Sequence, residues 1–209
     1  MASTRQSRSE AKRVEILRIA TDLFLAKGYD GVSVDAIVAR AGGTKTNVYK
    51  HFGGKAELFA AVIEELCRQI VHSFADMDLD GMDPEEALRQ IGRRFLTALL
   101  TQRSVRQHRV VVAESVRFPS IGKRWFKAGP ESAREPIAAY FARLQKSGRI
   151  RSGVAPRRLA GLFLDMLSEE QLLRQLIAGA ATPSPREINK LVDDAVGVFL
   201  HGAGSGKKK

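Results

Sequence analysis

Apolar residues recur every three or four positions along most of the 209-residue chain, and the alternation typical of strands is nearly absent. This spacing predicts an all-α protein of about nine helices. Three short helices come first, followed by a helix of about five turns whose apolar face runs from Leu58 to Phe74. Five further helices are expected: two that start at residues 84 and 105, one that ends near 146, and two over 157–177 and 186–200.

Glycine and hydroxyl residues mark the ends of the first helices. Gly28 is expected to end the first helix, and the Ser33 side chain can cap the second by accepting a backbone N–H. Gly42 and Gly43 separate the second helix from the third, for which Thr44 is the expected N-cap. Two short helices joined by a glycine-containing turn are typical of the helix-turn-helix, a DNA-binding motif.

The sequence predicts three regions. Residues 1–55 are expected to form the helix-turn-helix domain with a basic N-terminal arm, and residues 56–201 a helical regulatory domain. Residues 202–209, "GAGSGKKK", are expected to be a disordered basic tail. Cys67 is the only cysteine, which excludes an intrachain disulfide and suits a cytoplasmic protein. No apolar run reaches the length of a membrane-spanning helix, so no membrane partner is expected.

The net charge points to an anionic partner. The chain has 34 Lys and Arg against 23 Asp and Glu, a formal net charge of +11 and a pI near 10.1. Residues 1–55 hold ten of these cations against five acids. Such an excess favours an anionic partner such as nucleic acid or a membrane surface, with a merely basic protein as the alternative.

The segment between Asp35 and Glu57 contains four cations and no acid. Within it Val48 and Phe52 lie four residues apart, so both are expected to point into the core from the third helix. The other sides of this helix then face solvent or DNA, with no carboxylate to repel phosphate.

The side chains on that outer surface suit both parts of a DNA duplex. Hydroxyl and ammonium groups, as in Tyr49 and Lys50, can bind phosphate oxygens. Lysine can meet guanine acceptors and asparagine can pair with adenine, so Lys45, Thr46 and Asn47 have the chemistry to read bases. The alternative is an ordinary polar face of an exposed helix. The candidate DNA-binding residues are Ser33, Thr44, Lys45, Thr46, Asn47, Tyr49, Lys50, His51 and Lys55.

Residues 23–59, "LFLAKGYDGVSVDAIVARAGGTKTNVYKHFGGKAELF", resemble the DNA-binding domain of the TetR family of bacterial transcriptional regulators. The resemblance implies a repressor that binds a palindromic site in double-stranded DNA as a homodimer and is released by a small lipophilic effector. Gly43 stands where the family commonly has Val or Ala, and Thr46 where it often has Gly, which leaves the operator sequence open. The matching positions are Phe24, Gly28, Tyr29, Ser33, Val34, Ile37, Ala41, Gly42, Thr44, Lys45, Val48, Tyr49, His51, Phe52, Lys55, Leu58 and Phe59.

The resemblance also implies that the last two long helices pair with those of a second subunit. Both helices carry more apolar surface than one buried face needs, as a two-fold four-helix bundle requires. Intrachain core is the alternative, because periodicity does not separate the two. The expected interface residues are Leu162, Phe163, Met166, Leu173, Leu191, Val192, Ala195 and Phe199.

A pocket for the effector is expected within the regulatory domain. Apolar and aromatic side chains in its helices suit a drug-sized lipophilic ligand, and each of them can equally be plain core. Glu114 and His108 could orient such a ligand. The candidate pocket residues are Leu66, Ile70, Phe74, Phe95, Leu99, Val112, Trp125, Phe126, Tyr140 and Phe141.

Three other functions compete with a repressor. An enzyme is disfavoured, because the four histidines are scattered and no metal-ligand spacing, phosphate loop or nucleophile motif is present, so no catalytic residue, metal or cofactor is expected. The basic N-terminal residues and the lysine tail would also suit an architectural DNA-binding protein. An activator with the same fold stays open, because sequence does not reveal promoter geometry.

Overall fold

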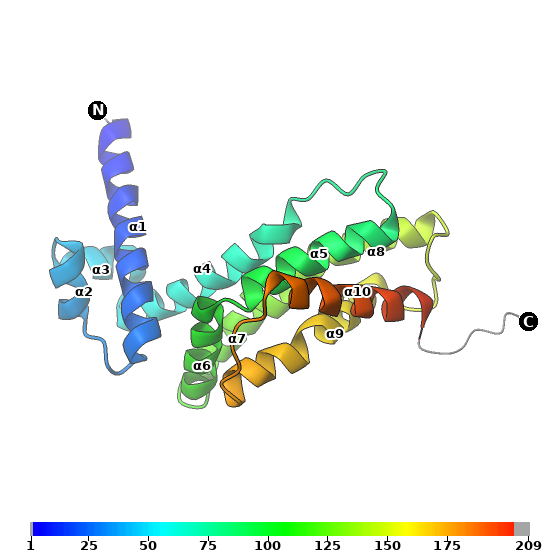
Figure 1. Ribbon diagram of the computed structural model, residues 1–209. Helices are drawn as coiled ribbons and strands as arrows, with labels where there is room; N and C mark the ends of the chain where they lie inside the picture. The colour runs from blue at the N-terminus through cyan, green and yellow to red at the C-terminus, as the bar shows by residue number, and fades with distance from the viewer. Residues whose placement is uncertain (1, 203–209) are drawn as a thin grey trace, which may run out of the picture. The chain divides into compact units, whose positions relative to one another are not determined.

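The computed structural model describes the backbone of residues 2–202 and the side chains of residues 7–202. Within these residues the chain forms ten α-helices, one short π-helical segment and no strand, which confirms the all-α class (Figure 1). The helices are α1 (Ala2–Lys27), α2 (Val34–Ala41), α3 (Lys45–Phe52), α4 (Lys55–Ala75), α5 (Pro84–Leu99), α6 (Gln102–Ser115), α7 (Pro119–Phe126), η1 (Lys127–Glu131), α8 (Ser132–Lys146), α9 (Pro156–Ile177) and α10 (Pro185–His201).

Two local expectations need correction. The basic N-terminal residues are not an arm before the first helix, because α1 already begins at Ala2 and residues 2–13 contain no glycine or proline to break it. The short helix α7 was not expected. The preceding helix α6 already ends at Ser115, and Pro119 occupies the first turn of α7, where its missing N–H costs nothing. The tail from 203 to 209 lies outside the described residues.

The chain divides into two compact units. The first comprises residues 1–68 and 106–128, and the second residues 69–105 and 129–209. This division differs from the expected boundary after residue 55, because the first turns of α4 belong to the first core. Leu58, Phe59 and Val62 are fully buried there, together with residues of α1.

The core of the first unit is built around aromatic rings. Phe24 of α1 meets Phe59 of α4 edge to face at 5.0 Å between ring centroids, and Tyr29 lies 5.2 Å from Phe59. Ile37 of α2 and Val48 of α3 are fully buried in the same cluster. Burying each such side chain stabilises the fold by about 1.5–3 kcal/mol, so this core holds α2 and α3 against α1 (Figure 1).

Helices α6 and α7 join the first unit through polar contacts as well as packing. The buried Gln107 side chain donates from Nε2 to the carbonyl of Ile63 at 3.0 Å, which connects α6 to α4. Arg124 of α7 donates to Glu57 and to Glu64, at 2.6 Å in both cases. These contacts explain why a segment beyond residue 105 belongs to the same unit as the first helices.

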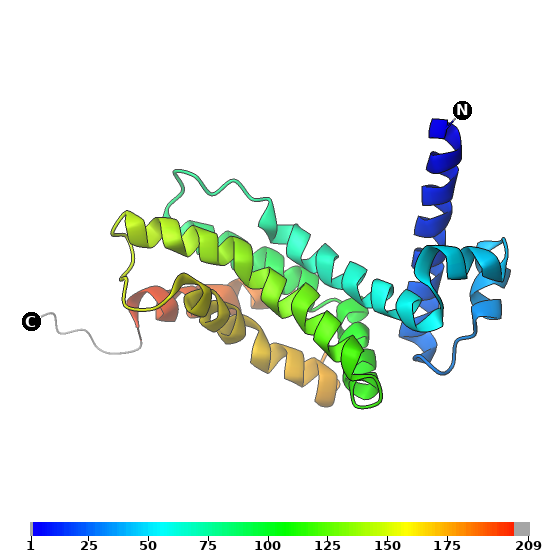
Figure 2. The same ribbon diagram turned by 180° about the vertical axis from the view of Figure 1, so that it is seen from behind.

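The second unit is a bundle of α5, α8, α9 and α10 with the last turns of α4 (Figure 2). Its centre holds Phe141 of α8, Phe163 of α9 and Phe199 of α10, whose ring centroids lie 5.2–6.3 Å apart. Aromatic pairs in this range add about 0.5–1.5 kcal/mol to their area burial. The first two rings are fully buried, so they hold the bundle together.

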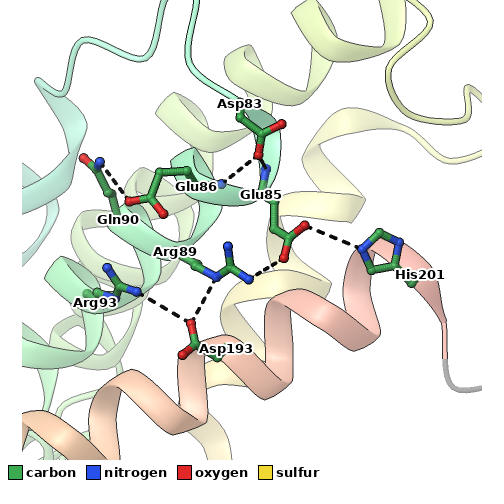
Figure 3. A network of polar contacts seen from close by, with 8 residues as sticks. All are labelled: Asp83, Glu85, Glu86, Arg89, Gln90, Arg93, Asp193 and His201. Carbon is green, nitrogen blue, oxygen red and sulfur yellow. Dashed lines mark hydrogen bonds and ion pairs between the residues drawn. The ribbon is translucent and has the colours of Figure 1, made fainter.

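A polar network at the surface of the second unit connects α5 to α10 (Figure 3). Asp83 caps α5 by accepting the N–H groups of Glu85 and Glu86, as its position before Pro84 predicts. Arg89 donates from Nε to Asp193 of α10 at 3.1 Å and also pairs with Glu85. Exposed pairs of this kind contribute about 0–1 kcal/mol each, so the network aligns the two helices more than it stabilises them.

At Gly92, helix α5 lies close to α9 and α10. A Cβ at this buried position of α5 would lie 3.0 Å from Cγ1 of Val192 and 3.4 Å from Cδ1 of Leu167. Glycine is therefore needed where α5 meets α9 and α10, although glycine costs about 1 kcal/mol in a helix.

Among the described residues, no helix combines the length and apolar character that crossing a bilayer requires.

We expect Gly92→Ala to lower the free energy of unfolding by about 1–2 kcal/mol, because overpacking outweighs the gain in helix propensity. Gly197→Ala in α10 is the matched control, since a Cβ there meets no atom within 4 Å. This control should raise stability by up to about 1 kcal/mol. Urea unfolding of both variants checks the prediction, and equal stabilisation by the two would contradict it.

Candidate nucleic-acid interface

The turn between α2 and α3 is set by backbone geometry that only glycine adopts easily. Ser33 caps α2, accepting the N–H of Ala36 at 3.1 Å, and Gly42 ends α2 with φ +69°. Gly43 follows with φ +107°, in the region that L side chains rarely enter. Thr44 is the N-cap residue of α3 as expected, but its side chain makes no capping hydrogen bond.

Lysine 12 of α1 secures this turn from the side. The Lys12 ammonium donates to the carbonyl of Ala41, at the end of α2, and pairs with Glu15 at 3.0 Å. A cation at a helix C-terminus also meets the negative end of the helix dipole. A Cβ at Gly43 would lie 3.3 Å from Cε of Lys12 and 2.9 Å from Nδ2 of Asn47. The glycine where the family commonly has a larger residue therefore fits both neighbours.

Helix α3 turns one side to the core and the rest to solvent. Val48 is fully buried, while Lys45, Thr46 and Lys50 are exposed and Tyr49 is 55% exposed. Among the other candidate DNA-binding residues, Ser33 and Thr44 are exposed, and Asn47, His51 and Lys55 are half-buried. The expected outward face is therefore present in the folded chain.

The expectation that both Val48 and Phe52 are fully inward is only half right. Phe52 is partly buried, and the guanidinium of Arg13 lies over its ring at 5.4 Å from the centroid. A cation held over an aromatic face is attracted by the ring quadrupole. Phe52 therefore connects the last turn of α3 to α1 instead of filling the centre of the core.

The outer face does contain a carboxylate, contrary to expectation. Lys45 Nζ, in the first turn of α3, lies 2.9 Å from Oδ1 of Asp35, near the start of α2. Both side chains are exposed. The hydrogen bond and the negative charge of Asp35 raise the pKa of Lys45 above its ordinary value. One of the cations on this face is thus paired within the chain.

The candidate phosphate ligand Lys55 is positioned by an aromatic side chain. Its Nζ lies 4.2 Å from the ring centroid of Tyr29. The centroid of the Tyr29 ring lies 4.9 Å from that of Phe118, at the start of α7. The backbone N–H of Tyr29 donates to the Glu114 carboxylate of α6 at 3.4 Å. Burial, followed by the charge of Asp30, raises the pKa of the Tyr29 hydroxyl. Tyr29 therefore connects Lys55 to the α6–α7 corner.

The residues expected at a dimer interface fall into three groups by exposure. Leu162, Met166 and Leu173 of α9 are exposed, the last two at 47% and 50%. Leu191 and Phe199 are half-buried. The expectation is wrong for Phe163, Val192 and Ala195, which are buried in the intrachain core because α9 and α10 each pack one face on the bundle.

The expected pocket residues are not brought together. Leu66 and Trp125 pack in the first core, whereas Ile70, Phe74, Phe95, Leu99, Tyr140 and Phe141 pack in the second. Val112 and Phe126 lie at the surface, 65% and 45% exposed. His108 is buried edge-on to Trp125, and Glu114 accepts the N–H of Tyr29, so both of the residues expected to orient a ligand have structural contacts.

Described residues of the second unit line a smaller and a larger cavity. The smaller, of about 200 Å³, is lined by Phe74 of α4, by Ile91 of α5 and by Ile137 and Arg143 of α8. The larger, of about 720 Å³, lies between the ends of α9 and α10 and includes Leu162, Met166 and Phe199. One of the expected pocket residues lines the smaller cavity, and three of the expected interface residues line the larger cavity.

No metal or nucleophilic chemistry is evident in the described part of the chain. Groups of three or more His, Cys, Asp or Glu side chains that could hold a metal ion are absent from residues 7–202. The Cys67 thiol is buried, and burial raises its pKa to about 11, so the reactive thiolate is scarce near neutral pH.

Two short helices joined by a glycine turn, with an exposed polar face on the second, define a helix-turn-helix transcriptional regulator. Residues 16–62 match the family model of bacterial regulatory proteins of the tetR family, and residues 86–202 match that of the AefR-like transcriptional repressor C-terminal domain. The chain belongs to the TetR family of transcriptional regulators. It is a regulator and not an enzyme, as the sequence predicts.

Relatives and solved structures of the same family support this assignment. The HTH-type transcriptional regulator LmrA of Bacillus subtilis is 35% identical, over 82% of this chain and 89% of that protein. A TetR-family regulator from Mesorhizobium loti superposes with a TM-score of 0.84 at 31% identity, over 92% of this chain and 96% of that chain. The flavonoid-responsive regulator FrrA gives a TM-score of 0.76 at 27% identity, over 91% and 96% of the two chains.

Sequence reasoning did not find two of the residues that shape this interface. Lys12 contacts Ala41, 29 positions away, so no local spacing reveals the contact. In the sequence Asp35 stands out only as the acid that precedes the acid-free segment before Glu57. Its contact with Lys45 follows from the turn that folds α3 back beside α2.

Proposed function

We propose that this chain represses transcription by binding a palindromic DNA site as a homodimer, and that a small lipophilic molecule releases it. The observation that carries the proposal is the exposed face of α3. Thr46, Tyr49 and Lys50 are exposed on this helix, while Val48 is buried on its inner side. In a helix-turn-helix such a face enters the major groove.

Each candidate residue has a role that fits its position. Lys50 and Lys55 bind phosphates of the backbone, and Ser33, Thr44 and Tyr49 add hydroxyl contacts that set the register. Asn47 and Lys45 read base edges, with Thr46 beside them at the start of α3. His51, at the end of α3, contributes a further polar contact to the backbone.

The homodimer forms through α9 and α10. Leu162, Met166, Leu173 and Val198 expose apolar surface on these helices, although both already contribute to the intrachain core. A two-fold axis would bring the same patch of a second copy against it and form a four-helix bundle. Leu191 and Phe199, half-buried in one chain, would complete the contact. Two copies of α3 would then reach successive major grooves, about 34–36 Å apart.

A lipophilic effector would act on the second unit. FrrA is named as responsive to flavonoids, aromatic molecules of a size that an apolar cavity can hold, and this chain resembles it along most of its length. The cavity beside Phe74 and Ile91 is small at about 200 Å³, so the bound state would be a wider form of the same site. Because α4 contributes residues to both units, its displacement would move the DNA-binding helices.

Two related functions fit less well. An architectural protein would bind DNA through charge alone, whereas the defined α3 face favours readout of a sequence. An activator would use the same contacts at a different promoter position, and the family model that matches residues 86–202 is described as that of a repressor. Either action on transcription would take place in the cytoplasm of a bacterial cell.

Selection from a pool of random-sequence duplexes should recover one palindrome with half-sites about 10 bp apart, centre to centre. Lys50→Gln should then weaken binding to that duplex and flatten the plot of log K against log salt by about 1.8, since a dimer loses two phosphate contacts. Lys146→Gln, an exposed lysine of α8, is the control for net charge and should leave the slope unchanged. Recovery of unrelated sequences with equal affinity would favour the architectural alternative.

Multi-angle light scattering should give about twice the 23.0 kDa chain mass for the unaltered protein. Met166→Glu should shift the mass to that of one chain, because a carboxylate in an apolar interface is left without a partner. Ala142→Glu, an exposed position of α8, introduces the same charge elsewhere and should stay dimeric. A monomeric unaltered protein at micromolar concentration would contradict the dimer.

A panel of flavonoids should include members that bind the chain, measured by isothermal titration calorimetry. Saturation with such a molecule should weaken binding to the selected duplex about 5–150-fold, the range of common allosteric couplings of about 1–3 kcal/mol. Fluorescence anisotropy of the labelled duplex provides the readout. A flavonoid that binds tightly and leaves DNA affinity unchanged would contradict release, and a panel without binders would exclude this chemical class.

A further inference from the structure

The ion pair between Asp35 and Lys45 is unusual for a surface that meets a polyanion. Asp35 belongs to the first turn of α2, and Lys45 is the first residue of α3. Their charged atoms lie 2.9 Å apart, and neither side chain is buried by the rest of the protein. A carboxylate at the N-terminal end of the recognition helix lies where phosphate or base edges would approach.

The pair is not needed to cap the helix. Ser33 already satisfies the start of α2 by accepting the N–H of Ala36. An acid in the first turn stabilises a helix through the dipole whether or not it also contacts a lysine. Thr44 makes no side-chain cap on α3, so the first turn of α3 is oriented by other contacts, among them this one. The contact with Asp35 therefore positions the Lys45 side chain more than it stabilises α2.

The other exposed cation of α3 behaves differently. Lys50 has no ion-pair partner within residues 7–202, so its ammonium is available to a phosphate. The Lys45 ammonium has three N–H donors, of which one is directed at Asp35. The two that remain match the O6 and N7 acceptors of a guanine, whereas a phosphate would have to compete with the carboxylate beside it.

We infer that Asp35 is a specificity-determining residue: it holds the Lys45 ammonium for base readout and keeps it from binding the DNA backbone. The inference rests on the proposed DNA-binding function and deepens it. Asp35 reduces affinity for DNA of any sequence, because it neutralises one cation and repels nearby phosphates. It increases discrimination, because a lysine fixed on one side reads one base position while a mobile lysine binds any phosphate.

Asp35→Asn keeps the shape of the side chain and removes its charge. Binding of this variant to a random-sequence 30-bp duplex should become several-fold tighter, and the plot of log K against log salt should steepen by about 1.8, for one new phosphate contact in each subunit of a dimer. The ratio of affinities for the selected palindrome and the random duplex should fall. Lys45→Met in the Asp35→Asn background should return the salt slope to that of the unaltered protein.

Asp22→Asn is the matched control, because Asp22 pairs with Arg18 within α1 and its loss changes net charge by the same amount. It should leave both the salt slope and the affinity ratio unchanged. Thermal unfolding of every variant separates a binding effect from a folding effect. A purely structural role for Asp35 would lower the melting temperature and weaken binding to both duplexes equally, which would overturn the inference.

The outcomes separate this inference from the proposed function. If the unaltered protein selects a palindrome but Asp35→Asn keeps the same slope and ratio, only the role of Asp35 is refuted. An increase in slope that persists after Lys45→Met would also refute it, because another cation would then be responsible. If the unaltered protein shows no sequence preference, the proposed function fails and the inference fails with it.

Discussion

The burial of Val48 in the first core is the contact on which the exposed face of α3 depends. It is the one fully buried residue of the eight-residue helix α3, and it packs in the same cluster as Ile37 and the aromatic rings of α1 and α4. With Val48 held inside, the other sides of the helix face outward, and Lys45, Tyr49 and Lys50 are exposed. A helix of two turns does not form alone in water, so the core also maintains its structure.

The turn before α3, together with the burial of Val48, fixes the position of α3. Gly43 allows a backbone conformation that other residues rarely adopt, and Lys12 joins the end of α2 to α1. The pair of Asp35 and Lys45 closes the turn on its outer side. A helix with one buried residue is thus held by contacts on both sides of its first turn, and the proposed readout of base edges would need such positioning.

In the second unit, α9 and α10 also have a buried face and an exposed face. Helices α9 and α10 each place one face in the intrachain core, where Phe163 and Val192 lie, while α9 and, at Val198, α10 also expose apolar side chains. That arrangement supports the bundle and, in the proposed homodimer, would offer the exposed residues to a second copy. Within the first unit, the α6–α7 corner contacts Tyr29 through Phe118 and contacts α4, the helix that begins at Lys55, through Arg124.

The sequence by itself determined most of the helices, their glycine ends and the helix-turn-helix, because each of these depends on spacing along a short stretch of chain, and the resemblance of residues 23–59 gave the family. Periodicity of 3.6 residues predicts an amphipathic helix, but it does not say which neighbour covers which face. Only the tertiary structure assigned Phe163 to the core and Met166 to the surface, separated the expected pocket residues, and paired Asp35 with Lys45. These contacts join residues from different helices, and they exist only once the chain has packed.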